Sequence, residues 1–172
     1  IMDRHRIVRW AACCIAGLVS LATARADIYR WDNGQPIPGT EGQTPGVGMV
    51  VKAISNAALN LQFANLANLN LARSYFYLSL LDNADFSHAQ LNAATFESSS
   101  LAGANLSAAN LDHARFLYSR LFGADFTGAI VVGADFGDAT DRGFTKEQLY
   151  STASYQQKDL QGIGLSHNNL TG

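Results

Sequence analysis

Residues 101–126 of the chain read LAGANLSAANLDHARFLYSRLFGADF. Leu or Phe recurs at every fifth position of this stretch, and Ala or Ser stands two residues before each of them. The same spacing extends in both directions, and its positions are Leu61, Leu66, Leu71, Phe76, Leu81, Phe86, Leu91, Phe96, Leu101, Leu106, Leu111, Phe116, Leu121, Phe126, Val131 and Phe136. None of the ten charged residues between 59 and 138 falls on these positions or two before them. The pattern therefore separates an inward-facing set from an outward-facing set.

A period of five residues excludes the two common regular structures. An α-helix advances about 140° in five residues, which would spread the apolar side chains around its circumference. A flat strand alternates its faces, so an odd period would send successive Leu residues to opposite sides. A chain that turns a corner of about 90° every five residues keeps them all inside, and four such sides close a square in twenty residues.

A second period, of twenty residues, supports this closure. It places identical or similar residues in columns, of which four are Phe76, Phe96, Phe116, Phe136; Leu61, Leu81, Leu101, Leu121; Asn65, Asp85, Asn105, Asp125; and Ser79, Ser99, Ser119. Coils stacked at the strand spacing of about 4.8 Å should bring the four Phe rings to about 5 Å from one another. The interleaved asparagines should separate aspartates that would otherwise repel. The inward-facing serines should donate hydrogen bonds to nearby backbone carbonyls.

Four segments resemble the A-(D/N)-L/F-x-x consensus of the pentapeptide-repeat family: Ala84-Asp85-Phe86, Ala104-Asn105-Leu106, Ala124-Asp125-Phe126 and Ala134-Asp135-Phe136. The resemblance covers about half of the chain. It implies an all-β solenoid, namely a right-handed quadrilateral β-helix with about four 20-residue coils over residues 59–138. The match is looser near Leu69 and Ser74, so the first coil is expected to be irregular. Repeat scaffolds of one family host unrelated functions, so the resemblance by itself implies no activity.

Residues 1–26 have the layout of a secretory signal peptide. Three arginines precede an apolar run at 10–21, and Ala24-Arg25-Ala26 supplies an A-x-A cleavage site. The apolar run is too short to span a bilayer, so stable membrane insertion is not expected, although a cytoplasmic N-terminal helix or a short membrane anchor is the alternative. This segment predicts a protein that is secreted or held in the cell envelope or periplasm of a bacterium.

Removal of the predicted signal changes the composition of the chain. Cys13 and Cys14 are both lost, which leaves no thiol chemistry. The remainder has 8 basic and 13 acidic residues, a net charge of about −5. This charge argues against unspecific binding to nucleic acid or to an anionic membrane.

The segments that flank the repeats have different predicted roles. Residues 27–58 hold all three prolines and five glycines, which predicts loop, with short strands at 28–31 and 49–51 that cover the open first coil. Residues 139–157 predict a loop and a short helix with a capping box, in which Thr145 is the N-cap and Gln148 the third helical residue. Phe144 and Leu149 fit a hydrophobic staple around that cap.

Residues 158–172 resume the five-residue spacing in an altered phase, at Leu160, Leu165 and Leu170. This segment is interpreted as a truncated set of repeats from a longer reading frame. An uncovered C-terminal edge would then favour self-association of the chain through that edge. The export signal and the two flanking segments also resemble those of secreted pentapeptide-repeat proteins from planctomycete-type bacteria.

No pattern in the sequence predicts an enzyme, a metal site or a cofactor. His88, His113 and His167 lack the spacing of metal ligands and are interpreted as surface residues. The aspartates lack the glycine-rich loop motif of calcium-binding β-helices. No nucleophile, base and acid converge, and a narrow core filled by Phe and Leu leaves no room for a ligand.

One outward-facing set of residues is unusually apolar. It comprises Tyr75, Tyr77, Leu78, Leu80, Leu117, Tyr118 and Phe122. Exposed apolar area of this kind can mark a protein interface, and the alternative is that residues 27–58 fold over it. Elsewhere on the outer surface, Arg115 and Asp135 occupy one column a coil apart, which predicts an exposed ion pair.

Two functional hypotheses remain. The first is a non-catalytic exported scaffold or protein-interaction module, whose protein partner the sequence does not name. The second comes from the resemblance to gyrase-protecting pentapeptide proteins and is an acidic nucleic-acid mimic that binds a DNA-binding enzyme such as gyrase. Export argues against the second hypothesis, because gyrase is cytoplasmic.

Overall fold

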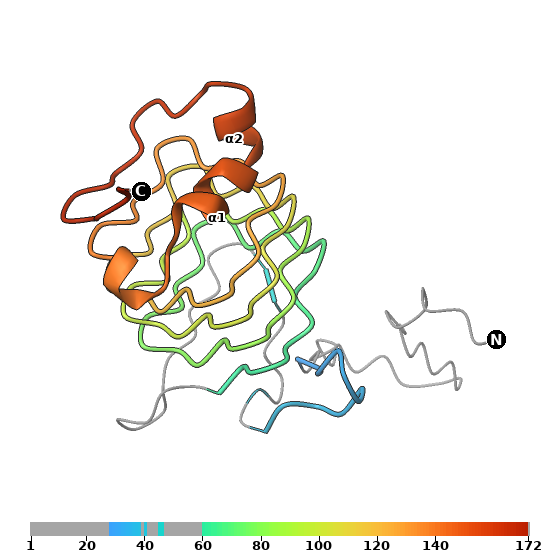
Figure 1. Ribbon diagram of the computed structural model, residues 1–172. Helices are drawn as coiled ribbons and strands as arrows, with labels where there is room; N and C mark the ends of the chain where they lie inside the picture. Colours follow the sequence, from blue (N-terminus) through green and yellow to red (C-terminus); the bar gives the residue numbers. More distant parts are fainter. Residues whose placement is uncertain (1–27, 39, 41–44, 47–59, 172) are drawn as a thin grey trace, which may run out of the picture.

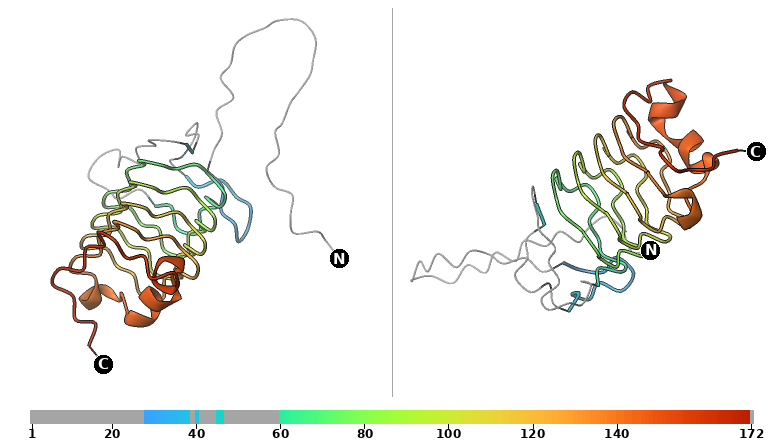
Figure 2. Two further views of the ribbon diagram at one scale, coloured as in Figure 1. Left: turned by 90° about the horizontal axis from the view of Figure 1, so that it is seen from above. Right: turned by 90° about the vertical axis from the view of Figure 1, so that its left-hand side faces the viewer.

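The computed structural model describes residues 28–38, 40, 45–46 and 60–171. The predicted signal peptide at 1–26 and the predicted strand at 49–51 lie outside the described residues. From residue 60 onward the chain winds into stacked coils, with the N-terminal hairpin beside the first coil and three short helices at the opposite end (Figures 1 and 2).

Neighbouring coils pair through isolated parallel bridges between residues twenty apart. The series begins at Asn60–Leu80 and reaches Arg115–Asp135, and it recurs at every fifth residue. At the Asp85–Asn105 bridge, the Phe86 amide donates to the Asn105 carbonyl at 2.8 Å, and the Asn105 amide donates to the Ala84 carbonyl at 2.9 Å. The twenty-residue period of the sequence is therefore the hydrogen-bonding register of the coils.

A tight turn after each apolar residue makes the corners of the coil. In a representative corner the Ala84 amide donates to the Leu81 carbonyl at 3.0 Å, and Asn83 between them has φ of 58°. Positive φ recurs at every fifth residue from Phe63 to Asp138, mostly without glycine. This backbone conformation costs an ordinary L-residue about 1–2 kcal/mol. Hydrogen bonds between coils, such as Asn83 N–H to the Ala102 carbonyl at 2.9 Å, offset that cost.

The apolar residues of the five-residue period form a single core. The rings of Phe76, Phe96, Phe116 and Phe136 lie in one stack, with neighbouring centroids 5.0 Å apart and planes within 6° of parallel. This confirms the predicted column. Phe144, which the five-residue period does not include, continues the stack at 4.4 Å from Phe136. All five rings are buried.

The polar columns behave largely as predicted. The hydroxyl of Ser119 donates to the Phe96 carbonyl at 2.6 Å, and that of Ser99 donates to the Phe76 carbonyl. The hydroxyl of Ser79, the first residue of this column, has no hydrogen-bond partner within the described part of the chain. The Asn105 amide donates to Asp85 at 3.1 Å, as the alternation of asparagine and aspartate suggested.

The predicted pair between Arg115 and Asp135 is wrong. Their backbones form the expected bridge, but the Arg115 guanidinium pairs with Glu97 at 2.6 Å. The Asp135 carboxylate instead accepts a hydrogen bond from the Gly137 amide at 2.9 Å. Glu97 lies one coil below Arg115 and one column across, so a long side chain reaches it diagonally. The twenty-residue period predicts which backbone segments pair, but it does not predict which of several nearby acids a long side chain contacts.

The described part of the N-terminal segment is an antiparallel hairpin on the first coil. Tyr29 bridges Pro36, and Arg30 bridges Ala64. The Trp31 amide donates to the Phe63 carbonyl at 2.9 Å, and Ile28 and Ile37 are buried against the core. The hairpin thus covers part of the edge of the first coil.

Arg30 adds a local contact to the N-terminal hairpin. Its guanidinium lies 4.4 Å from the centroid of the Phe63 ring and binds both carboxylate oxygens of Asp32. The hydrogen bonds from Arg30 hold the pKa of Asp32 below its usual range.

Three short helices follow the last regular coil: η1 (Thr140–Arg142), α1 (Lys146–Ser151) and α2 (Ala153–Gln156). The capping box of α1 is present as predicted, because Thr145 accepts from the Gln148 amide and the Gln148 side chain accepts from the Thr145 amide. The Gln148 side chain also donates to the carbonyls of Leu121 and Ala124, at 2.9 and 2.7 Å. One glutamine therefore caps its own helix and fastens it to the edge of the coil below.

The helices lengthen the final coil, which still pairs with the preceding coil at several positions, such as Leu121 N–H to the Arg142 carbonyl at 2.7 Å. In the regular repeats an amide donates to a carbonyl nineteen residues later, as Leu111 N–H does to the Ile130 carbonyl. The Phe136 N–H instead donates to the Gly164 carbonyl, twenty-eight residues later. The nine additional residues are taken up across 139–160. Stacking then resumes with a parallel bridge between Asp135 and Gly164, and Leu160, Leu165 and Leu170 pack partly buried against the core.

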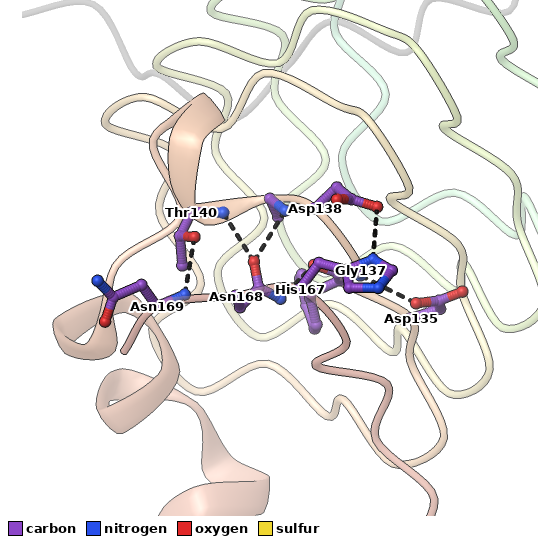
Figure 3. A network of polar contacts seen from close by, with 9 residues as sticks. Asp135, Gly137, Asp138, Thr140, His167, Asn168 and Asn169 are labelled. Carbon is purple, nitrogen blue, oxygen red and sulfur yellow. Dashed lines mark hydrogen bonds and ion pairs between the residues drawn. The ribbon is translucent and has the colours of Figure 1, made fainter. Parts of the chain in front are cut away.

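Asn168 closes the C-terminal end of the coils, as Figure 3 shows. Its amide oxygen accepts from the backbone amides of Ala139 and Thr140, at 2.9 and 2.8 Å, and its amide nitrogen donates to the Phe136 carbonyl at 2.7 Å. Beside it, Thr140 accepts from the Asn169 amide at 3.1 Å. The side chain of Asn168 therefore takes the place of the coil that would otherwise pair with this turn.

We expect Asn168→Ala to lower the free energy of unfolding by about 1–3 kcal/mol, because the Thr140 amide loses its side-chain acceptor and the buried Ala139 amide and Phe136 carbonyl each lose one of two partners. Denaturant unfolding followed by circular dichroism measures the loss, and hydrogen exchange at the Thr140 amide localises it. Asn169→Ala is the matched control, since that exposed side chain bonds only to Thr171. Equal losses in the two variants would contradict a closing role for Asn168.

Candidate interaction surface

The apolar outward-facing residues lie along one corner of the coils and are called the corner surface here. Its members are Tyr75, Tyr77, Leu78, Leu80, Leu117, Tyr118 and Phe122. Six of them are between 37% and 52% exposed. Leu117 is less exposed than the other six, because the next coil packs against it at Gly137. A Cβ added to Gly137 would lie 2.9 Å from Leu117 Cδ1. The structure therefore exposes six of the seven candidates and half-buries Leu117.

Aromatic contacts order part of the corner surface. The rings of Tyr75 and Tyr77 stack with centroids 5.8 Å apart. Phe122 packs beneath the turn after η1, where Gly143 has φ of 94° and an added Cβ would lie 2.5 Å from the ring. Each of these rings therefore contacts another part of the chain while remaining exposed on one side.

A shallow recess lies in the middle of the corner surface, and we call it the serine notch. The residues that line it are Leu78, Ser79, Leu80, Ser98, Ser99, Ser100, Tyr118, Arg120 and Arg142. Its shape follows from two columns, which read Leu78, Ser98, Tyr118 and Leu80, Ser100, Arg120. Because the middle coil contributes serine where the coils on either side contribute large side chains, the surface is hollowed at that coil.

Two arginines border the serine notch without a carboxylate partner. Arg142 lies over the Tyr118 ring at 5.7 Å, and Arg120 lies over the Phe122 ring at 6.0 Å. Within the described residues neither forms an ion pair, whereas Arg30 and Arg115 each do. The nearby carboxylate of Asp82 is occupied by Ser100, by the Ala102 amide and by Gln62. The notch therefore combines the apolar side chains of Leu78, Leu80 and Tyr118 with two guanidinium groups that form no ion pair among the described residues.

Sequence reasoning found the apolar residues of the corner surface and missed the notch. Writing the columns out would have shown serine between large residues at Ser98 and Ser100. The arrival of Arg142 was not visible in the sequence, because it follows the break in the five-residue period. Its position depends on η1 and on the hydrogen bond from the Leu121 amide to the Arg142 carbonyl at 2.7 Å.

The described part of the N-terminal segment does not bury the corner surface. Its hairpin bonds to Phe63 and Asn65, and the Trp31 indole donates to the Asn83 carbonyl at 2.7 Å. The Ser74 hydroxyl donates to the Gly46 carbonyl at 3.2 Å, next to Tyr75, which remains 40% exposed. Residues 47–59 lie outside the described residues, so the alternative that they cover this surface stays a prediction.

Other candidate groups were also located. His113 and His167 lie beside Asp112 and Asp138, at 2.8 and 3.5 Å, and His88 is exposed. Among the described residues, no group of three or more His, Cys, Asp or Glu is placed to hold a metal ion. Nor does that part of the chain contain a helix long and apolar enough to cross a membrane.

A second recess lies at the helical end, lined by Tyr150, Tyr155, Gln156, Lys158 and Leu160. Its two tyrosine rings have centroids 4.5 Å apart. The serine notch differs from it in bringing two arginines without acid partners to one site.

Coils that stack through parallel bridges between residues twenty apart define a solenoid repeat protein. The family model described as Pentapeptide repeats (8 copies) matches residues 60–97 and 89–128, and this region of the chain is similar to the pentapeptide-repeat family. A comparison with curated proteins found no match.

Solved structures of pentapeptide-repeat proteins are similar to this chain. One from the thylakoid lumen of Arabidopsis thaliana is 28% identical with a TM-score of 0.40, and the match covers 48% of this chain and 66% of that one. Another, from the cyanobacterium Cyanothece 51142, is 25% identical with a TM-score of 0.48, over 74% and 86% of the two chains. A third is QnrB1, a plasmid-mediated fluoroquinolone resistance protein, which is 15% identical with a TM-score of 0.35, over 64% and 59%.

Proposed function

We propose that this protein is a non-catalytic, exported protein-interaction module, built on a right-handed quadrilateral β-helix of about four coils. The observation that carries the proposal is the clustering of apolar side chains on one corner. Six of the eleven exposed large hydrophobic residues found in the described part of the chain belong to the corner surface. Contiguous apolar area of this kind marks interaction sites on soluble proteins.

The composition and rigidity of the corner surface support the same function. Tyr, Phe and Arg are enriched at the energetically important centres of protein interfaces. The backbone beneath them is hydrogen-bonded to the coils above and below. The conformational entropy lost by this backbone when a partner binds should therefore be small. Export is proposed from residues 1–26, which predict a signal peptide.

The acidic-mimic hypothesis receives less support from the surface. The carboxylates of Asp85, Asp125 and Asp135 each accept a hydrogen bond from a backbone amide two residues on. Asp85 also accepts from Asn105, and Glu97 is paired with Arg115. The acidic groups thus serve the coil itself, and no row of unpartnered carboxylates comparable to a DNA backbone is formed by these residues.

Site-specific photo-crosslinking tests the proposed function. We expect p-benzoylphenylalanine at Tyr118 to form covalent adducts with a partner protein in producing cells, because this position is exposed at the centre of the corner surface. The same group at Ala108 is the control, since that residue is exposed at another corner with the same backbone conformation. Absence of adducts at Tyr118, or equal adducts at both positions, would refute the proposal.

A further inference from the structure

We propose that the serine notch binds an acidic–apolar segment of a partner protein, with a large apolar side chain between Leu78, Leu80 and Tyr118 and a neighbouring carboxylate on Arg120 and Arg142. The inference rests on the proposed function and specifies the partner's chemistry. It is carried by the shape of the notch and by the two arginines, which are independent observations.

The apolar half of the site follows from the walls of the notch. Leu78 and Tyr118 are 49% and 48% exposed, and they flank Ser98 in one corner column. The serine side chains leave room for one inserted side chain, which would contact apolar surface on both flanking coils. Burial of such an anchor in a pre-formed recess is the usual source of interface affinity.

The charged half of the site follows from the placement of the arginines. The guanidinium groups of Arg120 and Arg142 lie over aromatic rings, and neither forms an ion pair among the described residues. A carboxylate matches the forked donor geometry of arginine. In a chain with a formal net charge of −2, two unpaired arginines at one recess favour an acidic segment over a basic one.

The small number of basic residues at the notch distinguishes this partner from nucleic acid. Nucleic-acid sites gather many basic residues along a polyanion, and here only two border a recess that is otherwise lined by Leu78, Leu80, Tyr118 and four serines. A single-stranded oligonucleotide is therefore included in the test as a competing ligand.

Four fluorescein-labelled octapeptides test the inference in an anisotropy titration with the full chain. The first has a central Asp-Leu-Phe-Asp, the second replaces both Asp with Asn, the third replaces them with Lys, and the fourth replaces Leu-Phe with Gly-Gly. We expect the first to bind at least about fivefold tighter than each of the others, and its advantage over the Asn and Lys peptides to shrink as salt rises. Equal binding by the Asp and Lys peptides, or tighter binding of an oligonucleotide, would overturn the inference.

Matched variants locate the binding. Ser98→Leu should fill the notch and abolish binding while the fold is retained, because Leu78 and Tyr118 adopt the same positive φ at equivalent corners. Arg120→Gln and Arg142→Gln should each lower the affinity for the Asp peptide about three- to fivefold and leave the affinity for the Asn peptide unchanged. The controls are Ala108→Leu and Arg73→Gln, which change exposed residues at other corners and should have no effect.

The crosslinking experiment separates failure of the inference from failure of the proposed function. Adducts at Tyr118 should be lost in the Ser98→Leu background and reduced in the Arg120→Gln, Arg142→Gln background. Adducts that persist unchanged in both backgrounds would overturn the inference and leave the interaction function standing. Complete absence of adducts in the unaltered chain would remove the function itself.

Discussion

Phe116→Asp is expected to prevent folding of the repeat region. Phe116 is fully buried, with stacked rings 5.0 Å away on both sides and the edge of Phe126 at 5.8 Å. A carboxylate in this position would have no partner, and its desolvation costs several kcal/mol. That cost is comparable to the whole stability of a domain, about 5–15 kcal/mol. Because each coil contacts only its neighbours, the change would also divide the solenoid at its centre.

Size and charge can be separated at the same position. Phe116→Ala should lower the free energy of unfolding by about 3–5 kcal/mol through the cavity it leaves. Phe116→Leu should cost less than about 1.5 kcal/mol, because Leu occupies the equivalent place on other sides of the coil. Denaturant unfolding monitored by circular dichroism gives these values. A folded Phe116→Asp protein with a stability near that of Phe116→Leu would refute the buried stack.

Phe144→Ala is expected to have the second largest effect, with a loss of about 3–5 kcal/mol at the C-terminal end. Phe144 is 2% exposed and stacks on Phe136 at 4.4 Å, with Phe126 edge-on at 6.0 Å. Its removal would uncover the last rings of the core and loosen the attachment of α1. We therefore also expect self-association that rises with concentration, because an apolar coil end would become available for stacking.

Sedimentation velocity and denaturant unfolding measure the two consequences of Phe144→Ala. Tyr150→Ala is the control, since Tyr150 lies on α1 but is 45% exposed. It should change neither the sedimentation coefficient nor the unfolding midpoint by an amount comparable to Phe144→Ala. If the two variants behave alike, Phe144 does not close the core.

The regular coils could be predicted because their stability depends on a local rule. Each five-residue unit places one large apolar residue inside and turns one corner, and the next coil repeats the same contacts twenty residues later. The positions of Phe96 and Phe116 therefore followed from spacing alone, as did the column that places Asn105 next to Asp85. The capping box of Thr145 and Gln148 was predictable for a similar reason, since it depends on residues three apart.

Contacts between long side chains could not be predicted in this way. Arg115 reaches Glu97 and not Asp135, because several acids lie within range of a flexible guanidinium and their relative positions decide the partner. The candidate site shows the same division. Its apolar residues were visible as outward positions, but the notch depends on how three coils align and on where Arg142 arrives after the repeats end.

The strict period is enough to establish the twenty-residue coil, the identity of the core column and the corner on which apolar side chains gather, because only one arrangement buries every Leu and Phe that falls on that period. How this arrangement is closed depends on tertiary contacts. Phe144 enters the ring stack from outside the period, Gln148 and Asn168 supply hydrogen bonds to the last coil, and nine additional residues are absorbed before stacking resumes. These contacts join residues whose separation follows no repeat. They form because the backbone N–H and C=O groups at the edge of the final coil need hydrogen-bond partners, which the nearest suitable side chains supply.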